Sequence, residues 1–359
     1  MSRSGSRAVV ALGLLAACTQ SIRPQTSPPP ALAGTITDQQ SHTTALLQAV
    51  SAVDDSVVWI SGHHATWVRT VDGGRTWVSG AMTGPDSALE FRDVEAVSAS
   101  TAYLLAAGPG EQSRIYKTTD AGQSWRLQFQ NHDSAAFYDC FGFWDATHGI
   151  AVSDAVRGKM IVIGTDDGEH WRAVAEEGMP PAVPGEGSPA AGGTCLIVRG
   201  RAQAWFGTEP QARVYRSDDR GRRWTVVTTP IVSGEAAGVA TLTFEDDRHG
   251  MALGGRLLKP DDRSDSVAAV TGDGGKTWTL AHRPTFSGAV YGSTMVPGMP
   301  GAVVAAGPKG LDWTADDGRS WTTLSTSAYW AVACSSSHAC WAVGPQGRIT
   351  SVRFAPPVR

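Results

Sequence analysis

Carboxylates and histidines recur along the 359-residue chain at spacings that could support acid–base or metal chemistry. Asp145 stands three residues before His148 in FWDATHG. Asp139 and Asp154 form a second candidate pair, because a glycosidase uses two carboxylates about 5–5.5 Å apart when it retains configuration and about 6.5–9.5 Å apart when it inverts. Whether either pair is a site depends on the elements that hold it.

A repeated motif accounts for many of the aspartates. RTVDGGRTW at residues 69–77 is followed by five related segments, and in each an Asp stands five residues before a Trp and a Gly three before it. Five of the six also have Ser or Thr two residues before the Asp, and the third has Gly164 there instead. We call this motif the box. Its Asp and Trp pairs are Asp72 with Trp77, Asp120 with Trp125, Asp166 with Trp171, Asp219 with Trp224, Asp273 with Trp278 and Asp316 with Trp321.

The box is typical of a tight turn between two strands. An Asp side chain can accept hydrogen bonds from the N–H groups of a turn, and Gly adopts backbone conformations that other residues resist. A β-prone stretch precedes each box, as in RIYKT, and a Trp-led stretch follows it, as in SWRLQF. We therefore interpret the box residues as structural, with each Trp anchoring a small sheet, and not as a catalytic set.

The spacing of the box Trp residues predicts a propeller. They lie 43 to 54 residues apart, which suits four short strands and their turns. Two of these units place Asp145 with His148, and Asp246 with His249, in the same first turn, so both pairs are expected to be structural. After the sixth box only three strand-like segments remain, and ALAGTITD at residues 31–38 could supply the fourth.

The predicted fold is therefore all-β: a seven-bladed propeller of four-stranded antiparallel blades, closed by an N-terminal strand and covering residues 35–355. Six blades with ragged ends are the alternative.

Composition excludes some function classes. The chain has 41 Gly and 13 Trp and a formal net charge of −4, which becomes about −6 when residues 1–17 are removed with Arg3 and Arg7. Nucleic-acid binders usually carry a basic patch or a high pI, so we expect no nucleic-acid partner. The chain has no dinucleotide-binding fingerprint and no CxxC pair, and we expect no cofactor and no metal.

The N-terminus reads as a targeting segment. Arg3 and Arg7 precede a short apolar run, and LAAC at residues 15–18 resembles a bacterial lipobox. This pattern predicts a lipoprotein signal peptide at 1–17, lipidation at Cys18 and a Pro- and Ser-bearing tether at 18–34. Ordinary signal cleavage near Ala17 is the alternative. We expect an extracytoplasmic protein, held at a bacterial membrane by its lipid on the periplasmic side or at the cell surface.

Four further cysteines lie in a compartment where disulfides persist. Cys334 and Cys340 flank SSSHA, a predicted turn, so a bridge across this hairpin is expected. Cys140 and Cys195 occupy similar places in successive repeats and form a second candidate bridge.

At the level of family, the chain resembles the Asp-box (BNR) propellers, and within them the photosystem II stability/assembly factor family and its bacterial lipoprotein relatives labelled "oxidoreductase". FRDVEAVSASTAYLLAAGPGEQSRIYKTTDAGQSW and FYDCFGFWDATHGIAVSDAVRGKMIVIGTDDGEHW carry the resemblance, which extends from about residue 31 to 354. Boxes alone are not specific, because sialidases and sortilin-type receptors also carry them. The resemblance implies a seven-bladed propeller with a binding or chaperoning role.

The longest insertions identify a candidate functional face. GPGEQS, AVRGK, KPDDRSDS and the segment 175–193 all fall on the face formed by middle-hairpin loops and blade-to-blade crossings. Function in repeat proteins often lies on such a face. We predict a mixed-charge rim around the channel mouth, unless these residues are only solvated or bond one another. The rim would consist of Arg92, Asp93, Tyr138, Asp139, Asp154, Arg157 and Glu235.

Two function classes follow. The first is a non-catalytic, membrane-tethered monomer that binds a protein partner or assembly intermediate on the long-loop face. The second is a glycoside hydrolase, either sialidase-like or of the two-carboxylate type. FRDV at 91–94 matches the sialidase Phe-Arg-Ile-Pro motif only in part, since it lacks the Pro and follows the first box where the family motif precedes it.

Overall fold

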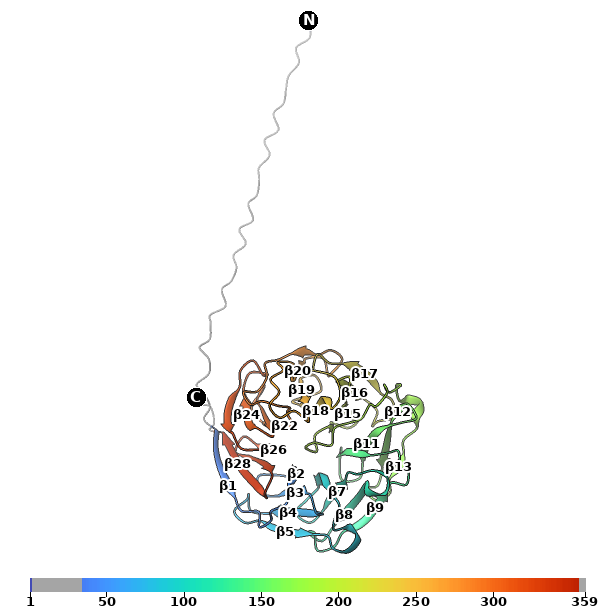
Figure 1. The fold of residues 1–359 in the computed structure, drawn as a ribbon, viewed down its shortest axis with the longest axis vertical. Coiled ribbons are helices and arrows are strands. Elements are labelled where there is room, and N and C mark those ends of the chain that lie inside the picture. The colour runs from blue at the N-terminus through green and yellow to red at the C-terminus, as the bar shows by residue number, and fades with distance from the viewer. Residues whose placement is uncertain (2–33, 355–359) are drawn as a thin grey trace.

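Seven antiparallel sheets surround a central axis in the computed structural model, which describes Met1 and residues 34–354 (Figure 1). Each sheet has four strands, and the sheets follow one another around the ring in chain order. The predicted seven-bladed, all-β propeller is confirmed. The expected signal peptide, the lipidation site Cys18 and nearly all of the tether lie outside the described residues. The tether's last expected residue, Gly34, instead begins the first strand.

The blades comprise consecutive strands, with one exception at the closure. Blade 1 contains β2 (Leu47–Ala52), β3 (Val58–Gly62), β4 (Thr66–Thr70) and β5 (Val78–Ala81). Blade 2 contains β6 (Phe91–Ala96), β7 (Ala102–Ala106), β8 (Arg114–Thr118) and β9 (Arg126–Gln130). Blade 3 contains β10 (Tyr138–Phe143), β11 (Gly149–Val156), β12 (Lys159–Thr165) and β13 (Arg172–Ala173). Blade 4 contains β14 (Leu196–Arg199), β15 (Gln203–Gly207), β16 (Arg213–Ser217) and β17 (Thr225–Thr228).

The remaining blades complete the ring. Blade 5 contains β18 (Ala237–Phe244), β19 (Gly250–Arg256), β20 (Ala268–Thr271) and β21 (Thr279–Leu280). Blade 6 contains β22 (Gly292–Met295), β23 (Val303–Gly307), β24 (Gly310–Thr314) and β25 (Thr322–Ser325). Blade 7 contains β26 (Ala331–Ser336), β27 (Ala339–Gly344), β28 (Arg348–Phe354) and β1 (Gly34–Gln39). Three short 3-10 helices lie in loops: η1 (Gly84–Asp86), η2 (Gly110–Gln112) and η3 (Glu176–Gly178). No helix in residues 34–354 has the length and apolar character needed to cross a membrane.

Ring closure joins the two ends of the described chain. β1 pairs with β28 from Gly34 opposite Phe354 to Gln39 opposite Ile349. The N-terminal strand therefore supplies the fourth strand of the last blade, as expected from the sequence. The pairing covers an edge that would otherwise offer unpaired backbone groups to another chain, and the six-bladed alternative is wrong.

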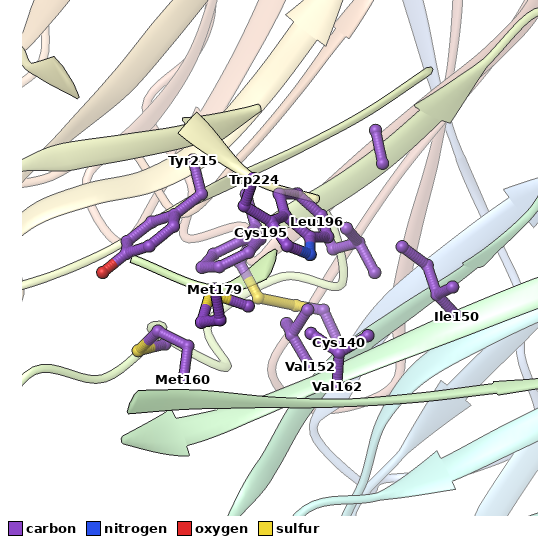
Figure 2. Packing of buried hydrophobic residues seen from close by; sticks show 12 residues of the cluster. Cys140, Ile150, Val152, Met160, Val162, Met179, Cys195, Leu196, Tyr215 and Trp224 are labelled. Carbon is purple, nitrogen blue, oxygen red and sulfur yellow. A yellow bond between two sulfur atoms is a disulfide. The ribbon is translucent and has the colours of Figure 1, made fainter. Parts of the chain in front are cut away.

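The core consists of apolar clusters shared between neighbouring blades. Figure 2 shows one of these, in which Val152 and Val162 of blade 3 meet Leu196 and Trp224 of blade 4. Trp224 is 6 % exposed, and burying a large apolar side chain contributes about 1.5–3 kcal/mol relative to leaving it exposed. The box Trp residues thus stabilise the contacts between blades as well as the blades themselves.

Both cysteine pairs considered from the sequence are bonded in the structure. Cys140 of β10 bridges to Cys195, which precedes β14, and so links blade 3 to blade 4 within the cluster of Figure 2. Cys334 bridges to Cys340 directly across the β26–β27 hairpin, with the two Cα atoms 4.0 Å apart.

Each box folds as a turn held by its own side chains. In the second box, the Thr118 hydroxyl donates to Asp120 at 2.8 Å and accepts from the Gly122 N–H at 3.0 Å. Asp120 accepts in addition from the Ser124 N–H and hydroxyl. These donors, the Ser124 hydroxyl first, lower the pKa of Asp120 to about 2, so its carboxylate is ionised at neutral pH.

The third box requires a correction. Its turn is held by Asp167, which accepts from the Thr165 hydroxyl at 3.1 Å and from the His170 N–H at 2.8 Å. Asp166, which the sequence pattern assigned to this role, is exposed and makes none of these bonds. The reason is that this turn is one residue shorter between its Thr and Trp171 than the other boxes, so counting back from the Trp selects the wrong Asp.

The Asp–His pairs that first suggested chemistry lie at two equivalent turns. His148 Nδ1 lies 2.9 Å from the Asp145 carboxylate, and His249 Nδ1 lies 2.8 Å from that of Asp246. In both turns the Asp also accepts the backbone N–H of the His. The pairs tie their own turns, and no group of three or more His, Cys, Asp or Glu in the described chain is arranged to hold a metal ion.

Candidate functional site

The insertion between blades 3 and 4 determines the shape of the long-loop face. It connects β13 to β14 and is fixed by Glu186, whose side chain has no exposed surface. Glu186 accepts from the Thr208 hydroxyl at 2.8 Å, forms an ion pair with Arg213 and accepts from the Tyr215 hydroxyl at 3.1 Å. A buried carboxylate with this many donors fixes the course of the chain, because any other course would leave its charge unpaired.

Beyond Glu186 the insertion crosses the centre of the ring. We call residues 187–193 the axial loop. The Ser188 N–H donates to Asp154 of blade 3 at 3.0 Å, and the Ala190 and Ala191 carbonyls accept from Gln48 of blade 1 at 3.0 and 3.1 Å. Gly192 also approaches the carbonyl of Trp330 at the start of blade 7, so the loop reaches from blade 3 to blades 1 and 7 and covers the mouth of the central channel.

The composition of the axial loop explains how it fits. A Cβ added at Gly192 would lie 2.5 Å from the Trp330 carbonyl, and one added at Gly193 would lie 2.6 Å from Asp93. Gly193 also has a φ of +74°, which side-chain-bearing residues adopt only with strain. The sequence GSPAAGG is small and uncharged because larger side chains would not pass between the inner strands. The axial loop therefore occupies the channel mouth around which the sequence predicted a mixed-charge rim.

The axial loop buries two of the predicted rim aspartates. Asp93 is 2 % exposed and accepts from the Val94 N–H at 2.8 Å and from the Phe141 N–H at 3.0 Å. The second bond joins the inner strand of blade 2 to that of blade 3. Burial, and secondarily the charge of Glu95, raises the pKa of Asp93 well above its usual value. Asp139, the other, is also 2 % exposed.

Asp139 belongs to a buried acidic cluster, which we define as Asp139, Asp154 and Glu209. Burial raises the pKa of all three carboxyl groups, that of Asp154 to about 6. Asp139 and Asp154 lie close enough to interact directly. The Oδ2 atom of Asp139 has no hydrogen-bond partner in the described structure. Arg92 is the cation that acts on Asp139.

The geometry of this cluster bears on the proposed chemistry. Asp139 is 2 % exposed, so a sugar cannot reach both carboxyl groups, whereas a two-carboxylate glycosidase requires access to both. The proximity of the two buried groups instead lets one proton be shared between Asp139 and Asp154. The cluster also borders the axial loop through the Ser188 N–H and through paired backbone bonds between Gly187 and Glu209.

The other predicted rim residues do not gather in one place. Tyr138 is 4 % exposed and packs edge-on against Phe129, and burial raises its pKa to about 12. Arg157 is an exposed loop residue paired with Asp133 at 3.2 Å. Glu235 is exposed in the loop before β18.

Arg92 alone among the predicted residues borders a hollow at the axis. This hollow has a volume of about 300 Å³, and we call it the axial cup. The cup is lined by Leu46, Gln48, His63, Arg92, Pro189, Ala190, Ala191, Leu257, Leu258, Tyr291 and Trp330. Five blades and the axial loop thus contribute to it.

The walls of the axial cup are apolar and in part unpartnered. Leu258 is 81 % exposed, more than any other large apolar side chain in residues 34–354. Tyr291 and Trp330 pack edge-to-face with ring centroids 5.2 Å apart, and the Tyr291 hydroxyl donates to the Leu257 carbonyl at 2.6 Å. Sequence reasoning missed these residues. The one available signal was the LL pair at 257–258, directly before a charged loop.

Two of the other hollows repeat with the blades. A groove of about 480 Å³ between blades 3 and 4 is lined by His148 and Arg222 among others, and one of about 360 Å³ between blades 5 and 6 by His249 and Arg319. These residues occupy equivalent positions in their repeats. These two grooves therefore arise from the packing of neighbouring blades, whereas the axial cup is built from five blades and the axial loop.

Comparison with solved structures places the fold among known propellers. The structure described as "YCF48 bound to D1 peptide" superposes with a TM-score of 0.66 at 16 % identity, covering 91 % of this chain and 100 % of that one. YCF48 from Cyanidioschyzon merolae gives 0.64 at 12 % identity, covering 89 % and 98 %. The WD40 repeats of RRP9 give 0.63 at 13 % identity, covering 92 % and 99 %.

These likenesses show the fold, since all three identities are low. YCF48 is a photosystem II assembly factor, so the neighbours include a member of the group that the sequence resembles. No family model matches the chain, and no curated protein is similar enough in sequence to match it.

Proposed function

We propose that this chain is a non-catalytic binding propeller that holds a protein partner, or an intermediate of a protein assembly, on its long-loop face. The observation that carries the proposal is the axial cup, with Leu258 81 % exposed at the centre of that face. Apolar and aromatic side chains at the centre of a surface are where binding energy concentrates in protein interfaces. The peptide-bound state of a structural neighbour supports the proposal.

The proposal includes a lipid anchor. LAAC at residues 15–18 supports cleavage before Cys18 and lipidation of its thiol, and the two disulfides suit an extracytoplasmic compartment. Metabolic labelling with an alkyne fatty acid tests this. Label is expected on the native chain and not on the Cys18→Ser variant, which should also leave the membrane fraction. Equal labelling of the two chains would contradict the anchor.

Site-specific photo-crosslinking in the native membrane tests the binding function. A photoreactive residue at position 258 is expected to give one stoichiometric protein adduct, identified by mass spectrometry. The matched control carries the same residue at position 280. Leu280 is also exposed, at 52 %, but lies on the outermost strand of blade 5. Absence of an adduct at 258, or the same adduct at both positions, would contradict the proposal and make a screen of glycan hydrolysis the next experiment.

A further inference from the structure

We infer that the axial cup selects an extended partner segment in which an acidic residue stands two positions from a large apolar one. The apolar side chain enters the cup, and the carboxylate, which lies on the same side of the extended segment, binds Arg92. This inference rests on the proposed function and specifies the chemistry of the partner.

The size of the cup limits what can enter it. A volume of about 300 Å³ lies at the lower end of the range of about 300–1,000 Å³ for small-molecule sites. The walls formed by Leu258, Tyr291 and Trp330 therefore suit one large side chain, or two small ones, and not a folded element. An extended segment meets this limit, because its successive side chains point to opposite sides and only one needs to enter.

Hydrogen-bonding groups around the cup determine what can stand beside that side chain. The acceptor and donors of Gln48 are already used, by His63 Nε2 at 2.7 Å and by the axial-loop carbonyls. Two donors remain without a partner in the described structure: Nη1 of Arg92 and the indole N–H of Trp330. Because these two donors are free, the group that stands beside the apolar side chain is expected to be a hydrogen-bond acceptor.

The single formal charge in the cup lining makes that acceptor anionic. Arg92 is the only Lys, Arg, Asp or Glu in the lining, and burial lowers the pKa of His63, which keeps it neutral at pH 7. Glu90 accepts from Nε and Nη2 of Arg92 at 3.1 and 2.6 Å and fixes the guanidinium. Glu90 also lies 3.6 Å from His63 Nδ1 and lines a neighbouring hollow together with Arg92, but it leaves Nη1 of Arg92 free. A carboxylate can therefore take the free Nη1 position.

Peptide titration of the full, folded chain tests this chemistry. The probes are N- and C-terminally capped, fluorescein-labelled nonapeptides with the central segments Glu-Ser-Leu-Ser-Glu, Lys-Ser-Leu-Ser-Lys and Glu-Ser-Ala-Ser-Glu, and binding is followed by fluorescence polarisation. The peptide with Glu and Leu is expected to bind at least about 10-fold more tightly than either of the others, equivalent to about 1.4 kcal/mol. Equal affinity for the Glu and Lys peptides, or for the Leu and Ala peptides, would overturn the inference.

Variants of the chain separate the two parts of the site. Leu258→Ser is expected to remove the preference for Leu over Ala, and Arg92→Gln to remove the preference for Glu over Lys while leaving the first intact. Leu280→Ser is the matched control and should behave as the native chain, and circular dichroism melts verify the fold of each variant. Unchanged selectivity in Arg92→Gln would overturn the role given to the guanidinium.

Two further outcomes separate this inference from the proposed function. A protein adduct at position 258 with unselective peptides would leave the binding function standing and show the segment chemistry to be wrong. Sedimentation that reveals a dimer in the native chain and a monomer in Leu258→Ser would place a second copy in the cup and overturn the inference as well.

Discussion

Asp120 and Asp139 lie in adjacent blades, and the chain uses them in opposite ways. Asp120 is exposed in its box turn and accepts hydrogen bonds from Thr118 and Ser124. Asp139 is 2 % exposed, and one of its carboxyl oxygens has no partner among the described residues. Donors lower the pKa of Asp120, whereas burial, followed by the charge of Asp154, raises that of Asp139.

The difference separates the repeated part of the molecule from the part that occurs once. A box aspartate lies beside its own donors, because the motif that supplies the Asp also supplies the Ser or Thr. An inner-strand aspartate depends on segments far away in the chain, such as the axial loop. The repeated aspartates are therefore structural, and the carboxyl groups with raised pKa values lie beside the insertion that has no counterpart in the other blades.

Of the variants that test the difference between box and inner-strand aspartates, Asp93→Ala is expected to lose the most stability. Asp93→Ala removes the acceptor of the buried Phe141 N–H between blades 2 and 3, and a buried donor left unpaired costs about 1–3 kcal/mol, more when a charged partner is lost. We expect a loss of about 2–3 kcal/mol in the free energy of unfolding, measured by chemical denaturation. Asp93→Asn keeps an acceptor and should lose less than about 1 kcal/mol. Equal losses in both variants would show that the bond between blades is not the cause.

The next effect is a pH dependence that arises from the buried acidic cluster. Burial raises the pKa of Asp154 from 3.8 to about 6, so the stability that this group contributes is fully present below about pH 4 and is lost as the pH rises through 6. After allowance for its partial exposure and its coupling to Asp139, we expect about 1–2 kcal/mol between pH 4 and pH 7.5.

Asp154→Asn tests this dependence, because the amide oxygen still accepts from the Ser188 N–H but does not titrate. The difference in unfolding free energy between the variant and the native chain should grow in favour of the variant as the pH rises from 4 to 7.5. The charge of Asp154 raises the pKa of Asp139 and of Glu209, so its removal relieves both groups at high pH and adds to the trend in favour of the variant. A constant difference over this range would mean that Asp154 has an ordinary pKa.

The blades and their turns, which repeat along the chain, could be predicted from the sequence. The buried aspartates and the axial cup, which depend on a single insertion, could not. The spacing of the boxes and the unpaired N-terminal strand were enough to predict seven blades, because each box supplies the residues that form its own turn. The inner-strand positions of Asp93 and Asp139 were also predictable. Their burial was not, because it depends on the course of residues 175–193, which has no counterpart in the other blades. The axial cup was missed for the same reason, since Leu258, Tyr291 and Trp330 meet only in three dimensions.

The smallest effect concerns the third box, where Asp166 and Asp167 stand side by side. Asp167→Ala removes the acceptor of the Thr165 hydroxyl and of the His170 N–H, but water can replace these bonds at an exposed turn. We expect a fall in melting temperature of about 2–4 °C, measured by differential scanning calorimetry, and less than about 1 °C for Asp166→Ala. The reverse order would restore the assignment by distance from Trp171. The expected order would show that the Asp holding the turn of a box is identified by its distance from the Thr and not from the Trp. The reason is that the carboxylate binds the Thr hydroxyl.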